Sequence, residues 1–72
     1  MVMPLGLLAD GEQAEIVGLG SGALDARAED LGLRAGKRIE VLANAGGPVL
    51  VKVDETRIAV ARGLAMRITV RP

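Results

Sequence analysis

Two pairs of carboxylates in predicted turns have the chemistry to bind a metal ion: Asp10 with Glu12, and Asp54 with Glu55. Hard cations need several oxygen ligands that converge on one point. Neither pair has the spacing of a calcium-binding loop, and both fall in stretches that are typical of turns. We therefore interpret these carboxylates as solvated turn residues and predict no metal site.

The residue types that usually carry catalysis or hold a cofactor are absent or in the wrong context. The sequence has no histidine and no cysteine, so no serine can have an imidazole base and no thiolate metal site can form. Lys37 is the only lysine that follows a glycine, but Arg38 comes next, where a phosphate-binding loop needs serine or threonine. We therefore predict no catalytic residue and no cofactor.

Length and composition indicate one small domain over residues 1–72. The formal net charge is zero with scattered charges, and Phe, Tyr and Trp are absent, which disfavours both nucleic-acid binding and proline-rich peptide binding. The opening MVMPLGLLADGE has the features of neither a signal peptide nor a membrane span. The expected location is the cytoplasm, without membrane insertion.

A short amphipathic helix is predicted after the first strand. Ser21 is a suitable N-cap, Asp25 suits the positive end of the helix dipole, and Gly32 is placed to end the helix in a left-handed conformation. The apolar stripe of this helix consists of Leu24, Ala28 and Leu31.

Alternating apolar residues predict five short strands. A glycine-containing loop at 44–48 and a turn at 54–56 separate the middle strands, and 62–65 connects the last two. This pattern indicates a mainly β barrel with one helix. The strands are marked by 13–19, by Ile39, Val41 and Ala43, by Val49, Val51 and Val53, by Ile58 and Val60, and by Met66, Ile68 and Val70.

Several short motifs occur in a characteristic order: the helix-ending LGL, a glycine two residues before the second strand, a Gly-Pro hairpin, IAV and a closing ITV. Together with the upstream MPLGLLADGEQAEIVGL, they resemble the FeoA family of small ferrous-iron-transport accessory proteins over almost the whole chain. One departure is the Asp-Glu-Thr-Arg turn at 54–57, where the family often has a glycine.

The resemblance implies an SH3-like barrel and a non-enzymatic cytoplasmic protein that acts on FeoB, a membrane Fe(II) permease with its own GTP-binding domain. Two alternatives stay open. One is a nucleic-acid-binding barrel of the KOW or Sm-like kind, and the other is a stand-alone barrel similar to the C-terminal domain of iron-dependent repressors. The first would use a basic patch of Arg34, Lys37, Arg38 and Lys52. Self-association is also left open.

Two surfaces are candidates for binding the partner. If a five-residue loop pairs Ala43 with Val49, Leu42 lies opposite Leu50 on the outer face of the barrel. These leucines are either a partner surface or are covered by the N-terminal segment around Leu5, Leu7 and Leu8 or by the helix. The second candidate is the solvent-facing side of the helix, with Arg27 and Glu29.

Overall fold

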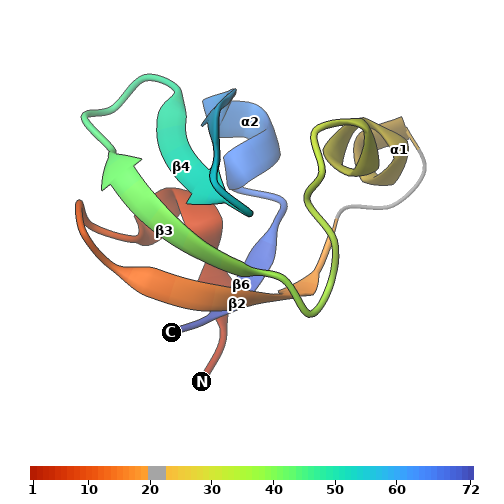
Figure 1. The fold of residues 1–72 in the computed structure, drawn as a ribbon, viewed down its shortest axis with the longest axis horizontal. Helices are drawn as coiled ribbons and strands as arrows, with labels where there is room; N and C mark the ends of the chain where they lie inside the picture. Colours follow the sequence, from red (N-terminus) through yellow and green to blue (C-terminus); the bar gives the residue numbers. More distant parts are fainter. Residues whose placement is uncertain (20–22) are drawn as a thin grey trace.

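Six strands form one antiparallel sheet in the order β1-β6-β2-β3-β4-β5, which curls around a single core (Figure 1). The computed structural model describes residues 1–19 and 23–72, and of the second range the side chains of 26–72. The predicted mainly β fold is confirmed, with one strand more than expected because Met3 and Pro4 pair with β6. The strands are β1 (Met3–Pro4), β2 (Gln13–Gly18), β3 (Arg38–Ala43), β4 (Val49–Val53), β5 (Thr56–Val60) and β6 (Thr69–Arg71).

The core consists of aliphatic side chains that alternate with exposed or half-buried ones along the strands. In β4 the three valines are buried while Leu50 and Lys52 are half-buried, as the period of a strand with one buried face requires. No polar side chain is buried among the described residues. The largest fully buried side chains are Leu5, Leu8, Ile16, Leu33, Ile39, Ile68, Val41, Val49, Val51, Val60 and Val70.

The helix α1 (Ala23–Asp30) ends in a Schellman motif. Gly32 has a φ of +85°, and its N–H donates to the carbonyl of Glu29 over 2.9 Å. The N–H of Leu33 donates to the carbonyl of Ala28, also over 2.9 Å. The predicted helix stop at Gly32 is therefore confirmed.

The predicted inner stripe of α1 is visible in part. Ala28 is fully buried and Leu31 is half-buried against the core. The predicted N-cap Ser21 lies outside the described residues, as do the side chains of Leu24 and Asp25. Because β1 comes before β2 in the chain, α1 follows the second strand along the sequence and not the first.

The predicted register between β3 and β4 is wrong near the hairpin loop. Val41 pairs with Val51 as expected, but Ala43 then pairs with Leu50, because a bulge places two β3 residues against one residue of β4. The N–H of Asn44 donates to the Asp10 carboxylate over 2.7 Å, which fixes the chain where it leaves β3. Ala43 is exposed as a result and does not line the core.

Two short helical turns lie outside the predicted elements. The 3₁₀ turn η1 (Leu5–Leu7) follows β1, and α2 (Arg62–Ala65) occupies the predicted connection before the last strand. Met66 was expected in that strand, but its N–H donates to the carbonyl of Arg62, so it forms the C-cap of α2 and the strand begins only at Thr69.

Candidate functional site

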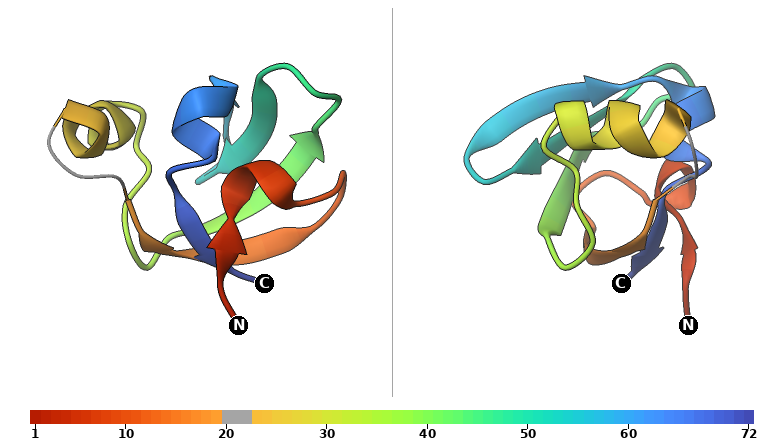
Figure 2. Two further views of the ribbon diagram at one scale, coloured as in Figure 1. Left: turned by 180° about the vertical axis from the view of Figure 1, so that it is seen from behind. Right: turned by 90° about the vertical axis from the view of Figure 1, so that its right-hand side faces the viewer.

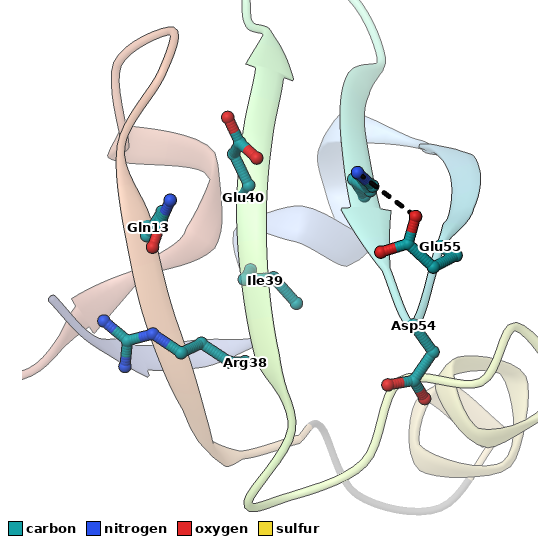
Figure 3. A pocket seen from close by; sticks show the side chains of 7 residues that line it. Gln13, Arg38, Ile39, Glu40, Asp54 and Glu55 are labelled. Atoms are coloured by element: carbon teal, nitrogen blue, oxygen red, sulfur yellow. Dashed lines mark ion pairs between the residues drawn. The ribbon is translucent and has the colours of Figure 1, made fainter.

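A shallow hollow of about 320 Å³ lies on the outer face of the sheet, over β2, β3 and β4 (Figure 3). Its floor is a row of side chains in register across three strands, since Gln13 pairs with Glu40 and Glu40 with Lys52. The hairpin turn between β4 and β5 forms one wall. The lining residues are Gln13, Arg38, Ile39, Glu40, Lys52, Asp54 and Glu55.

Opposite charges neutralise one another in and beside this hollow. Lys52 Nζ lies 3.5 Å from Glu55 Oε2, and Lys37 Nζ lies 2.5 Å from Asp54 Oδ2. Within the described residues, no group of three or more His, Cys, Asp and Glu side chains is arranged to hold a metal ion. The hollow therefore presents charges of both signs, of which Lys52, Asp54 and Glu55 are in ion pairs.

The carboxylates that suggested metal binding lie in two separate turns. Asp54 and Glu55 are exposed, as predicted, and both have left-handed backbones with φ of 51° and 67°. At the other turn, Asp10 accepts the N–H of Asn44, and Glu12 accepts the N–H of Ala9 over 2.6 Å. This second pair stabilises backbone geometry in addition to being solvated.

The basic patch of the nucleic-acid-binding alternative is partly neutralised by these contacts. Lys37 and Lys52 are each within ion-pair distance of a carboxylate of the β4–β5 turn. Arg34 and Arg38 are exposed. Two of the four cations are thus already compensated, which weakens the attraction for phosphates.

The predicted leucine pair on the outer face is not a directly opposed pair. The bulge in β3 places Leu50 opposite Ala43, and Leu42 is the extra residue beside it. Both leucines are half-buried, and neither is among the side chains that form the core or pack against it. The predicted cross-strand contact is therefore wrong, while a role for these leucines in binding a partner stays a prediction.

Arg27 and Glu29 are both exposed on α1. The helix lies on the opposite side of the barrel from the loop that joins β3 and β4 (Figure 1). Leu42 and Leu50 lie next to that loop, so the structure places the two candidate pairs in different parts of the barrel.

A third surface, which sequence reasoning missed, is formed by η1 and α2. Leu7 is 58% exposed and Met66 is 40% exposed, although the sequence predicted Met66 in a strand and offered the segment around Leu7 as one of the alternatives for covering the outer leucines. Gly6 lies directly beneath Met66, because a Cβ at Gly6 would be 2.5 Å from Met66 Sδ. The absence of a side chain at Gly6 was the one sequence signal of this close approach.

A network of side-chain hydrogen bonds ties this third surface to the hairpin loop. Asn44 Nδ2 donates to the carbonyls of Gly6 and Leu8 over 2.9 and 2.7 Å. Arg62 donates to the Gly6 carbonyl over 3.1 Å, to the Gly47 carbonyl over 2.9 Å, and to the side-chain oxygen of Asn44. The network joins η1, the loop and α2 into one unit.

Comparison with known proteins decides the family of this barrel. A family model described as the FeoA domain matches residues 3–72. The chain belongs to the FeoA family. A curated relative, Fe(2+) transport protein A of Methanocaldococcus jannaschii, is 35% identical over 69 residues, which cover 93% of this chain and 83% of the relative.

Solved structures of FeoA proteins have the same fold. The crystal structure of an iron uptake regulatory protein (FeoA) matches with a TM-score of 0.90 and 33% identity, over 99% of this chain and 96% of that one. FeoA of Stenotrophomonas maltophilia, described as a procaryotic SH3 domain protein and crystallised with zinc, matches with a TM-score of 0.82 and 28% identity, over 94% and 88%. The SH3-like fold implied by the resemblance is confirmed.

The repressor alternative receives support for its fold alone. A manganese-dependent transcriptional repressor matches with a TM-score of 0.86 at 21% identity, over 97% of this chain but 41% of the repressor. The FeoA match favours the iron-transport interpretation over this one. As for membranes, none of the helices in the described part of the chain has the length and apolarity to cross a bilayer.

Proposed function

We propose that this FeoA-family protein is a non-enzymatic accessory protein of Fe(II) uptake that contacts a FeoB-type permease from the cytoplasm. The observation that carries the proposal is the FeoA match over residues 3–72, since it includes every strand of the barrel. The iron-transport name of the Methanocaldococcus jannaschii relative supports the same process.

The chemistry of the surface favours binding over catalysis. The sequence offers neither histidine nor cysteine, and three charged side chains of the outer hollow are held in ion pairs, Lys52 with Glu55 and Asp54 with Lys37. Fully buried aliphatic side chains make up the core, which leaves a compact barrel that presents a rigid surface. Such a surface suits recognition of another protein.

Co-purification with the permease tests the proposal. Tagged protein is incubated with detergent-solubilised membranes that contain the FeoB-type permease and, in parallel, with membranes from a strain that lacks it. We expect the permease to be retained with the tagged protein, and cells without the accessory protein to take up less Fe(II). Absence of retention together with normal uptake would contradict the proposed function.

Variants on the two predicted surfaces extend this test. Arg27→Glu with Glu29→Lys exchanges the charges on α1 while conserving the net charge. Leu42→Gln with Leu50→Gln replaces the half-buried leucines by polar residues of similar size. If one double variant loses permease binding and the other keeps it, the interface lies on the surface that carries the substitutions of the first variant.

A further inference from the structure

Acidic residues are unevenly distributed along this chain. All nine Asp and Glu residues lie between positions 10 and 55, whereas residues 1–9 and 61–72 contain three arginines and no acid. These two terminal segments form β1, η1, α2 and β6. β1 pairs with β6, and η1 lies beside α2 (Figure 2), so the segments build one continuous part of the surface.

The exposed large apolar side chains lie in the same segments. Among the described residues they are Leu7 and Met66, on η1 and just after α2, together with Met1 and Val2 before β1. The packing of Met66 over Gly6 brings Met66 next to the turn that carries Leu7. We call Leu7 and Met66 the η1–α2 patch.

The η1–α2 patch is held in place before any partner binds. The Gly6 carbonyl, one residue before Leu7, accepts hydrogen bonds from both Asn44 and Arg62. The N–H of Met66 donates to the Arg62 carbonyl over 2.9 Å. Because the backbone that carries Leu7 and Met66 is already fixed, binding a partner costs little backbone conformational freedom, which favours the patch as a contact surface.

Arg67 supplies positive charge beside the patch. Arg62 donates its hydrogen bonds within the protein, and Arg71 lies 3.6 Å from Glu15. Arg67 is exposed, and within the described part of the chain it takes part in no ion pair. Asp10, the nearest acid along the chain to Leu7, accepts the N–H of Asn44.

We infer that the η1–α2 patch with Arg67 binds an acidic segment of the permease that carries at least one apolar side chain; this inference rests on the proposed function. Apolar contacts to Leu7 and Met66 would anchor the segment, and a carboxylate would pair with Arg67. One arginine raises attraction to an anionic membrane only about fivefold, too little for stable binding to lipid. The observations therefore favour a protein segment.

The test compares two exposed arginines on different surfaces. Arg67→Glu and Arg57→Glu introduce the same charge change, next to the patch and on β5 respectively. Binding to permease-containing nanodiscs and to lipid-only nanodiscs of the same anionic composition is measured at low and high salt. We expect Arg67→Glu to weaken permease binding by at least about tenfold and to reduce its salt dependence, while Arg57→Glu binds like the natural protein.

Leu7→Gln provides an independent variant at the most exposed residue of the patch, and its unfolding midpoint reports whether it folds. If the natural protein binds the permease and both Arg67→Glu and Leu7→Gln bind it with the same affinity, the inference is overturned and the proposed function stays intact. Equal binding to lipid-only nanodiscs would overturn the choice of a protein segment. No permease binding by the natural protein would overturn the proposed function and this inference together.

Discussion

The guanidinium of Arg62 donates a hydrogen bond to the side-chain oxygen of Asn44, and both side chains donate to the carbonyl of Gly6. The two residues are 18 positions apart and join α2 to the β3–β4 loop. Because the shared acceptor lies in η1, the pair also holds the N-terminal segment against the barrel. This contact couples the three segments that surround the η1–α2 patch.

Asn44→Ala tests how much this network stabilises the fold. The substitution removes three side-chain hydrogen bonds and leaves the Leu8 carbonyl without its side-chain donor. We expect the free energy of unfolding to fall by about 1–3 kcal/mol, measured by urea denaturation. Gln13→Ala is the control, since this exposed amide should change stability by less than about 0.5 kcal/mol. Equal midpoints for the two variants would contradict the role of the network.

Glu55→Gly is expected to stabilise the protein. Asp54 and Glu55 occupy the two central positions of a two-residue hairpin, and both are left-handed, which is a type I′ turn that favours glycine at the second position. Relief of the left-handed strain outweighs the added flexibility of glycine, for a net gain of up to about 1 kcal/mol. The unfolding midpoint in urea measures the gain.

Glu55→Gln separates backbone strain from charge in this turn. Glu55 is exposed and 3.5 Å from Lys52, so the ion pair contributes little. We expect Glu55→Gln to leave stability within about 0.5 kcal/mol of the natural protein. A midpoint for Glu55→Gly at or below that of Glu55→Gln would show that strain at this position is not relieved by glycine.

The local sequence predicts those parts of the fold that depend on interactions between residues close together in the chain. Burial of alternate valines in β4 follows from strand period, and the helix stop follows from the backbone freedom of Gly32. The position of Met66 depends instead on α2, whose single turn has no sequence signal strong enough to exceed that of the alternating strand.

The candidate contact surfaces were harder to predict, because they are shaped by contacts between residues far apart in the sequence. The bulge at Leu42 and Ala43 arises where Asp10 fixes the Asn44 N–H, an interaction across 34 residues. No pattern within the hairpin sequence indicates this bulge. The predicted pairing of Leu42 with Leu50 is therefore wrong by one residue, and Ala43 takes the place of Leu42. The packing of Met66 over Gly6 is equally non-local.

Gly32→Val is expected to destabilise the protein by about 1–2 kcal/mol, because a β-branched residue is strained at a φ of +85°. A Cβ at this position would meet no atom within 4 Å, so backbone conformation alone accounts for the loss. Gly47→Val is the matched control, since its Cβ would also be in open space but its φ is not left-handed. Similar urea midpoints for the two variants would contradict this explanation.

Isolated protein is expected to bind Fe(II) no tighter than roughly millimolar. The sequence supplies no imidazole or thiolate, and Asp54 and Glu55 already lie near lysines. Anaerobic isothermal titration calorimetry measures the affinity, with Asp54→Asn and Glu55→Gln as the comparison. A stoichiometric micromolar site would contradict the prediction, and its loss in the double variant would locate it at the β4–β5 turn.

Leu42→Gln with Leu50→Gln separates packing from recognition on the outer face. Substitution of a fully exposed leucine pair would change the free energy of unfolding by less than about 0.5 kcal/mol, whereas truncation of a buried leucine costs about 2–5 kcal/mol. Both leucines are half-buried and lie outside the core, so we expect an intermediate loss of about 1–2 kcal/mol for the pair. Urea denaturation measures this loss, and the variant should remain folded at room temperature.

Permease binding by this folded variant then decides between two apolar surfaces. If the η1–α2 patch is the contact, the glutamines at 42 and 50 should leave permease affinity within about twofold, because these side chains are not part of that patch. Leu7→Gln should show the reverse pattern, with stability nearly unchanged at its 58% exposure and affinity reduced. Loss of binding in the double variant with retention in Leu7→Gln would assign the interface to Leu42 and Leu50.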